Sequence, residues 1–384
     1  MRPISIIHNS LVLNTPFVVG KQRSDSERQT SDLSVAALGA PWPSPATRVQ
    51  SRRVAGLRLS TSGRNSAATR PTHPARHRVH VRVGGFPALS IDENIALGGH
   101  FTGAGAHELE RWIVRSEEQV DRIDAGKLRA LFATLDQDQS SVNDRGIIPP
   151  LAVWTYFTTA APWHALGPDG HPARGLFLPP VALPRRMWAG GSFTFHGDLR
   201  VGDQALRRST IMQIHFKEGR SGPLVFVTVG HDVSVDQRVV IHETQDIVYR
   251  EAPAPGAPLS TAPAAPTDAA FSRTIVPDPV LLFRYSALTF NGHRIHYDRS
   301  YATGVEGYPG LVVHGPLIAT FLLELLRSEH PKARVRRFTF KSLGPLFDIH
   351  PFKVAGRQES PGCFALWASD ADGRLAMQAS AEID

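Results

Sequence analysis

The sequence lacks the patterns of several common functional sites. It contains one cysteine, Cys363, in 384 residues, so it can form neither an internal disulfide nor a thiolate metal cluster. It has no His-Glu-x-x-His pair and no glycine-rich loop ending in Gly-Lys-Ser/Thr, which are the signatures of zinc proteases and of phosphate-binding loops. We therefore expect no metal site and no nucleotide cofactor.

Long apolar runs are also missing. No stretch of the chain approaches the roughly 18 uninterrupted apolar residues of a membrane span. The apolar run from Leu11 to Gly20 is interrupted by Asn14 and Pro16 and has no strongly basic segment before it, unlike a secretory signal. Together with the single cysteine, these features predict a cytoplasmic protein that does not engage a membrane.

Acidic residues are scarce in the first part of the chain. Residues 1–90 hold 13 of the 42 Lys and Arg but 3 of the 35 Asp and Glu. The net charge of +7 is therefore concentrated there, which argues against a nucleic-acid partner for the rest of the chain. Because this segment has no regular hydrophobic period, we predict a disordered basic tail over residues 1–106. An organellar transit peptide and a nucleic-acid-binding arm are the alternatives.

The next part of the chain, residues 107–251, reads as one α+β unit. Apolar residues at helical spacing predict a helix within 107–138: Ile123, Leu128, Leu131, Phe132 and Leu135. A region rich in proline, glycine and aromatic residues follows at 149–184 and is expected to wrap over a core. Four runs of strand-forming residues then predict an antiparallel sheet: 192–195, 205–217, 224–229 and 238–250.

Residues 252–272 are dominated by proline and alanine and predict a linker. A second α+β unit is expected over 273–384, beginning with a strand or turn at Val280–Tyr285. Its central helix, Pro316–Arg327, has almost no polar face and must be enclosed by protein. A sheet curled around that helix would enclose it, and four strands are expected to form it: 334–342, 352–357, 364–369 and 375–383.

The segment from Tyr285 to His296 and the later His314-Gly315-Pro316 resemble the motifs of the MaoC-like (R)-specific enoyl-thioester hydratases. The matching positions are Tyr285, Leu288, Thr289, Ile295, His296, His314 and Gly315. The departures are Phe290 in place of glycine, Asn291 in place of the catalytic aspartate, His293 in place of asparagine and Arg294 in place of proline. The resemblance implies a hot-dog fold, in which a sheet wraps one long helix.

A narrower branch is matched by four further segments: 169–175, 184–191, 222–229 and 246–250. They resemble the 3-methylfumaryl-CoA (mesaconyl-CoA) and itaconyl-CoA hydratases, whose layout the mitochondrial hydroxyacyl-thioester dehydratases share. This resemblance implies an α+β double hot-dog, with two antiparallel sheets that each wrap a helix and a catalytic C-terminal half. It implies a hydro-lyase that converts an unsaturated acyl-CoA to citramalyl-CoA without a cofactor. A fatty-acid-type dehydratase, a hot-dog thioesterase and a non-catalytic acyl-thioester binding module are the alternatives, and a homodimer is possible.

The resemblance also assigns roles to residues. His296 is expected to be the base, because imidazole titrates near neutral pH. Asn291 is expected to orient the same water, and the N–H of Gly315 to stabilise the thioester oxygen at the helix start. His293 and His314 are expected to support the site and to take part in binding the substrate. Each histidine could instead be structural, and Gly-Pro is also an ordinary way to begin a helix.

A second carboxylate on the acyl group would need a cation near it. Arg294 is the first candidate, followed by Arg299 and Arg284. The phosphates of CoA would need lysine or arginine at the mouth of the site, and the sequence leaves several candidates open: Arg185, Arg186, Lys341, Arg336 and Arg337.

Overall fold

The computed structural model describes residues 103–219, 222–252 and 262–384. Nearly all of the expected tail and residues 253–261 of the expected linker lie outside these ranges. The first described element is helix α1 (Gly103–Glu110), so residues 103–106, which the sequence assigned to the tail, belong to a helix. Among the described residues, no helix is both long enough and apolar enough to cross a membrane.

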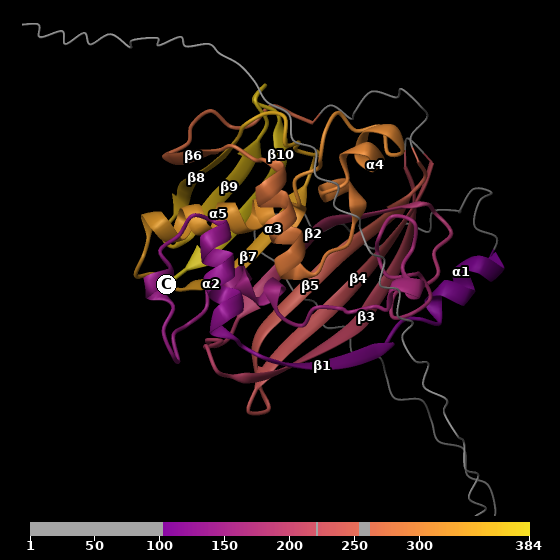
Figure 1. Ribbon diagram of the computed structural model, residues 1–384, viewed down its shortest axis with the longest axis horizontal. Helices are drawn as coiled ribbons and strands as arrows, with labels where there is room; N and C mark the ends of the chain where they lie inside the picture. The colour runs from indigo at the N-terminus through magenta and orange to yellow at the C-terminus, as the bar shows by residue number, and fades with distance from the viewer. Residues whose placement is uncertain (1–102, 220–221, 253–261) are drawn as a thin grey trace, which may run out of the picture. The chain divides into compact units, whose positions relative to one another are not determined.

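The strands form one antiparallel sheet in the order β1-β3-β4-β5-β2-β7-β10-β9-β8-β6 (Figure 1). The N-terminal half supplies β1 (Ser116–Arg122), β2 (Arg185–Phe195), β3 (Gln204–Gly219), β4 (Gly222–Val235) and β5 (Arg238–Arg250). The C-terminal half supplies β6 (Phe271–Ile275), β7 (Val335–Ser342), β8 (Phe352–Ser360), β9 (Cys363–Ser369) and β10 (Leu375–Ile383). This is the predicted α+β double hot-dog, with the two expected sheets continuous where β2 pairs with β7.

A glycine and several aromatic rings form the junction of β2 and β7. Gly190 pairs with Lys341, and a β-carbon on Gly190 would lie 2.6 Å from the carbonyl oxygen of Phe340. Glycine therefore allows the two strands to approach this closely. The rings of Trp154, Trp188 and Phe340 pack edge to face, with centroids 5.1 to 6.0 Å apart. Apolar surface from both halves is buried together at this junction.

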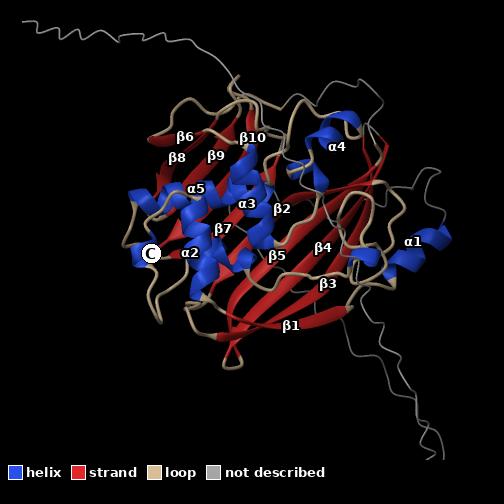
Figure 2. Ribbon diagram, viewed as in Figure 1, coloured by secondary structure: helices blue, strands red, loops and turns tan. Residues whose placement is uncertain are grey.

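The predicted central helix is α5 (Gly315–Glu329), which packs against β6, β8, β9 and β10. Figure 2 shows the helix lying across the strands of its half. Most of its residues are buried: Leu317, Ile318, Ala319, Thr320, Phe321, Leu322, Leu323, Leu325 and Leu326. The expectation of an enclosed helix is therefore confirmed.

The predicted strand or turn at 280–285 is wrong, because these residues belong to helix α3 (Pro279–Thr289). The side chain of Asp278 accepts a hydrogen bond from the N–H of Leu281 at 2.7 Å and caps the helix, and Pro279 occupies its first turn. The helix ends at Phe290, whose φ of 51° is left-handed. A short helix, α4 (Arg299–Gly304), follows the loop after α3.

The helix expected within 107–138 is confirmed for residues 125–134, but the rest of this range is not helical throughout. The region forms α1, then strand β1, then helix α2 (Ala125–Thr134), whose first turn is capped by Asp124. Strand β1 forms because it pairs with β3 along its whole length, an interaction between distant parts of the chain. Short 3-10 helices complete the described elements: η1 (Gln139–Ser141), η2 (Pro150–Thr155), η3 (Trp163–Ala165) and η4 (Arg294–His296).

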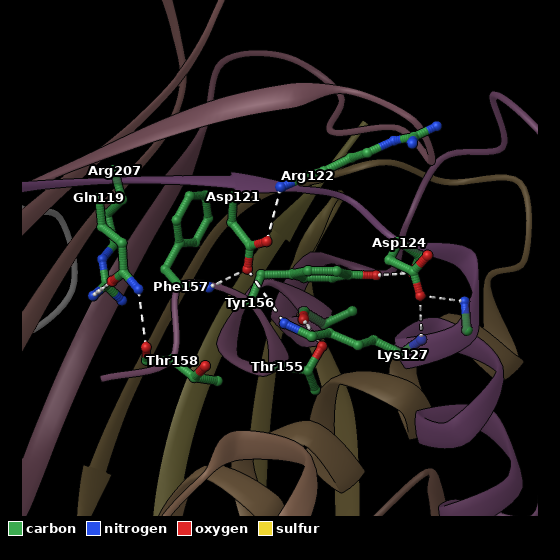
Figure 3. Close-up of polar contacts among 12 residues, drawn as sticks. Gln119, Asp121, Arg122, Asp124, Lys127, Thr155, Tyr156, Phe157, Thr158 and Arg207 are labelled. Carbon is green, nitrogen blue, oxygen red and sulfur yellow. Dashed lines mark hydrogen bonds and ion pairs between the residues drawn. The ribbon is translucent and has the colours of Figure 1, made fainter. Parts of the chain in front are cut away.

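The region after η2 wraps over the core, as predicted, and polar contacts tie it to β1 and α2 (Figure 3). Tyr156 and Phe157 are both buried. The hydroxyl of Tyr156 donates to the carbonyl oxygen of Asp124 at 2.7 Å, and the N–H of Phe157 donates to the carboxylate of Asp121 at 2.9 Å. These two hydrogen bonds fix the start of the segment that leads to residues 163–184.

Candidate active site

His296 lies at the end of η4, in the loop between α3 and α4, and is buried. Its Nδ1 is 2.7 Å from the carbonyl oxygen of Val312. A carbonyl can only accept a hydrogen bond, so Nδ1 carries the proton and Nε2 of the neutral ring keeps a free lone pair. Burial lowers the pKa of His296 to about 4, although the bond to Val312 opposes the shift. The ring is therefore an unprotonated base at neutral pH.

His314 immediately precedes α5 and stacks on His296, with ring centroids 3.7 Å apart and planes 17° from parallel. Its Nε2 shares a hydrogen bond of 2.8 Å with the hydroxyl of Ser286 on α3. Its Nδ1 is buried and has no partner among the described residues. Burial, followed by the neighbouring His296 and His293, holds the pKa of His314 well below its usual value. His314 therefore contacts His296 directly, and its expected role as a support stays a prediction.

His293 is the third member of the group. Its ring meets His296 edge to face at a centroid distance of 5.4 Å, and its centroid lies 4.0 Å from that of the His171 ring. Burial lowers the pKa of His293, and the charge that His171 would carry lowers it further. Four imidazoles therefore lie in contact, which we call the histidine cluster: His171, His293, His296 and His314.

The N-terminal half contributes His171, together with Asp169, which the sequence analysis did not assign to the site. Nδ1 of His171 lies 2.9 Å from Oδ2 of Asp169. Burial opposes ionisation of this carboxyl, but the bond to His171 outweighs it and lowers the pKa of Asp169. The two side chains are each about a quarter exposed or less. In the sequence, these two residues stood out only because segment 169–175 resembles the mesaconyl-CoA and itaconyl-CoA hydratases.

Close backbone contacts lock this N-terminal loop to the loop of His296. The N–H of Arg294 donates to the carbonyl oxygen of Asp169 at 2.9 Å. Gly170 has a left-handed φ of 87°, and a β-carbon there would overlap the carbonyl oxygen of Gly292. Both glycines are therefore required by the approach of one backbone to the other.

Asn291 has a local role in the structure. Its Oδ1 accepts a hydrogen bond of 3.0 Å from the N–H of His293, and its own N–H donates to the carbonyl oxygen of Ser286 at 2.8 Å. This is an Asx turn, which shapes the loop between α3 and η4. The orientation of a water by Asn291 stays a prediction.

Gly315 is the first residue of α5, as expected. The first N–H groups of a helix lack partners within the helix, and Pro316 has none to offer. The N–H of Gly315 therefore lies at the positive end of a helix, directly after His314. A β-carbon on Gly315 would meet the hydroxyl of Ser342 at an ordinary 3.7 Å, so steric crowding does not account for this glycine.

Two of the three expected carboxylate-binding arginines, Arg294 and Arg299, form ion pairs within the protein. Arg294 binds the carboxylate of Asp298 through Nε and Nη2, at 3.0 and 2.8 Å. Arg299 pairs with Asp348. The structure gives Arg284 no carboxylate partner among the described residues, but places it on α3 beside a surface hollow between α2 and α3 rather than in the histidine cluster.

The basic residues considered for the phosphates of CoA also divide into those with an acidic partner and those without one. Most have acidic partners: Arg185 with Glu306, Arg336 with Asp384, and Arg337 with Glu382. Arg186 and Lys341 form no ion pair with a residue that the structure describes. Arg186 also lies close enough to His171 and His293 to be among the causes, after burial, that lower the pKa of both rings.

Asp169, His171 and His293 each offer a ligand atom, and the three atoms lie within 4.8 Å of one another. This spacing is compatible with a metal ion. Asp169 and His171 are, however, already joined by a hydrogen bond, so a proton fills the place between them. The expectation that the protein uses no metal stays a prediction.

The chain is similar to known thioester dehydratases and hydratases. The family model described as hydroxyacyl-thioester dehydratase type 2 matches residues 152–348. The mesaconyl-C(4)-CoA hydratase of Chloroflexus aurantiacus is 47% identical over 275 residues, covering 71% of this chain and 96% of that protein.

The chain belongs to the hydroxyacyl-thioester dehydratase type 2 family.

The mitochondrial hydroxyacyl-thioester dehydratase type 2 of Schizosaccharomyces pombe is a more distant relative, 28% identical over 271 residues, 62% of this chain and 86% of that protein. Among solved structures, a MaoC-like dehydratase has a TM-score of 0.53 at 13% identity and covers 71% of this chain and 99% of that one. A MaoC-like dehydratase from Phytophthora capsici has a TM-score of 0.55 at 12% identity, covering 72% and 96%. These structures support the predicted fold.

Membership of the type 2 dehydratase family confirms the predicted enzyme class, a hydro-lyase acting on thioesters. The family match spans both halves of the chain and includes Asp169, His171, His293, His296 and His314. In this member of the family the histidine cluster is therefore assembled from both halves, and not from the C-terminal half alone.

Proposed function

We propose that the protein hydrates 3-methylfumaryl-CoA (mesaconyl-CoA) or itaconyl-CoA to citramalyl-CoA. The identity of 47% to a mesaconyl-C(4)-CoA hydratase supports this substrate class. The observation that carries the chemistry is the hydrogen bond from Nδ1 of His296 to Val312. It leaves Nε2 of a buried imidazole free to act as a base beside the start of α5.

In the proposed reaction, Nε2 of His296 takes a proton from water as the water oxygen bonds to the β-carbon. The π electrons of the double bond move toward the thioester oxygen, where the N–H of Gly315 stabilises the negative charge. The enolate then takes the proton back from His296 at the α-carbon. Because burial disfavours the imidazolium, the proton is returned readily. One water is added and no electrons are exchanged, so no cofactor is needed.

The same groups acting in reverse would dehydrate a 3-hydroxyacyl thioester. The relative in S. pombe, a hydroxyacyl-thioester dehydratase, supports this second candidate. A thioesterase is less well supported, because it needs a nucleophile or a carboxylate directed at the thioester carbon. Asp298, the acid that follows the loop, is engaged with Arg294.

We propose Arg186, rather than Arg294, as the cation that receives the distal carboxylate of the substrate. A carboxylate in a partly buried site is stable only beside a cation or strong donors. Arg294 is held by Asp298, whereas Arg186 has no acidic partner among the described residues and lies near His171 and His293. Arg299 would be available only if its pair with Asp348 opened.

A panel of enoyl-CoA thioesters, analysed by mass spectrometry, tests this function. Hydration of 3-methylfumaryl-CoA is expected to add the mass of one water without release of free CoA, which a thiol reagent detects. Release of CoA would instead indicate a thioesterase, and no change in any thioester would favour the non-catalytic binding module. His296→Gln should lower turnover about 10²-fold or more, as expected for loss of a positioned proton-transfer group.

We also propose that the protein acts in the cytoplasm, based on its single cysteine, Cys363. The possible homodimer stays a prediction. Light scattering coupled to gel filtration of the full chain measures its mass directly. A mass of one chain under assay conditions would contradict the dimer.

A further inference from the structure

In the loop of His296, neither the amide of Asn291 nor a free carboxylate is placed to share the work of a base. Oδ1 of Asn291 is occupied by the N–H of His293, and the remaining amide nitrogen only donates hydrogen bonds. A donor is poorly suited to an attacking water, because it binds the lone pair that must form the new bond. The carboxylate that follows this loop, Asp298, is bound by Arg294.

The N-terminal half brings such a group to the histidine cluster. Among the described residues, Asp169 is the only acid that hydrogen-bonds to one of the four rings. Its carboxylate accepts from Nδ1 of His171, since a lowered pKa keeps it ionised at neutral pH. The bond fixes the ring and leaves Nε2 of neutral His171 as a free acceptor. His296 is held in the same tautomer, by Val312.

The position of His171 is built into the fold. Its ring centroid lies 4.0 Å from that of His293, and the ring of His293 in turn contacts His296. The backbone bond from Arg294 to Asp169 and the contact between Gly170 and Gly292 hold the two loops together. The side chains of Asp169 and His171 are 25% and 21% exposed, so they are neither sealed in the core nor loose on the surface.

We propose that His171, oriented by Asp169, is a second catalytic residue that holds the attacking water together with His296. This inference rests on the proposed hydration. One hydrogen of the water moves to Nε2 of His296 and is later returned to the α-carbon. The other stays on oxygen and donates to Nε2 of His171, which fixes the direction of attack on the β-carbon. His171 gains and loses no proton over the cycle, and Asp169 acts through it as a positioning residue.

The test compares variants of the full chain in the hydration of 3-methylfumaryl-CoA. His171→Ala should lower kcat about 10²-fold, and Asp169→Asn roughly tenfold or more, by analogy with loss of the group that orients a catalytic histidine. KM should change little, because water is held rather than the acyl chain. Added imidazole should restore part of the activity of His171→Ala, an effect that a purely structural role would not produce.

His164→Ala is the matched control, because His164 is an exposed histidine on η3 in the same N-terminal region, and it should keep the wild-type rate. Thermal unfolding of each variant separates a lost contact from a lost fold. Wild-type rates in both Asp169→Asn and His171→Ala, with inactive His296→Gln, would overturn this inference alone. Stoichiometric zinc, with activity lost on chelation, would also overturn it. A wild type that hydrates no thioester would overturn the proposed function and this inference with it.

Discussion

Gly170 and Gly292 meet where the loops of the two halves join: a β-carbon on Gly292 would lie 2.6 Å from the carbonyl oxygen of Gly170, and one on Gly170 would overlap the carbonyl oxygen of Gly292. Each loop carries part of the histidine cluster, Asp169 and His171 on one side and His293 and His296 on the other. A change in the packing of these two glycines should therefore displace the histidine cluster and lower turnover.

We predict that Gly170→Ala separates the loops and lowers turnover about 10²-fold, the usual effect of displacing a reacting group by roughly 1 Å. Gly202→Ala is the matched control, because Gly202 has a similar φ of 92° but no atom within 4 Å of a β-carbon. It should lose about 1 to 2 kcal/mol of unfolding free energy from backbone strain and keep its turnover. Equal kinetic effects in both variants would contradict the importance of the contact.

The pH dependence of kcat/KM should reflect the lowered pKa of His296, about 4. A base with the ordinary histidine value of about 6.5 would lose about tenfold in rate between pH 7.5 and 5.5, because most of it would become protonated. A base with a depressed pKa stays unprotonated across this range, so the rate should hardly change. Short assays with unfolding followed at each pH provide the control. An acidic limb centred near pH 6.5 would contradict a lowered pKa for the catalytic base.

The role of Asn291 can be tested with two substitutions. Asn291→Asp keeps an oxygen that accepts the N–H of His293 and so preserves the Asx turn, whereas Asn291→Ala removes it. We expect Asn291→Asp to stay within a few fold of the wild-type rate, because the hydrogen bond is kept and its free energy changes little. Asn291→Ala should be clearly slower. If both lose activity equally, the amide group itself contributes to catalysis.

The receptor for the distal carboxylate can be identified by comparing two substrates. Arg186→Ala should slow the hydration of 3-methylfumaryl-CoA about 10- to 100-fold more than that of crotonyl-CoA, which lacks the second carboxylate, because a charged hydrogen bond contributes about 1.5 to 3 kcal/mol. Arg294→Ala should affect both substrates alike, since its guanidinium is bound to Asp298. A selective loss in Arg294→Ala would return the role to that residue.

The elements that the sequence predicted well are those whose pattern is local. The apolar residues around α5 demanded an enclosed helix, and β3, β4 and β5 were evident from their runs of strand-forming residues. Helix α3 was missed because Val280 and Tyr285 favour strands, although Asp278-Pro279 is a helix start. Strand β1, Ser116–Arg122, is largely charged and exposed, and only its pairing with β3 makes it a strand.

Within the site, the C-terminal members were predictable because they lie close together in the sequence and resemble a known motif. The contribution of Asp169 and His171 was not, since they precede His293 by more than 100 residues and meet it only in the folded chain. The engagement of Arg294 with Asp298 was equally hidden, because a sequence does not show which partner a long charged side chain selects.

The pairing of β2 with β7 has a consequence for how the protein can be divided. In a hot-dog unit that began at residue 273, β7 would lose its partner β2 and present unpaired backbone donors and acceptors to solvent. The ring of Phe340, which is buried in the full chain, would become exposed as well. Such an edge invites pairing with other chains. The truncated unit would therefore tend to self-associate, and it would also lack the carboxylate and imidazole that the other half places beside the reacting water.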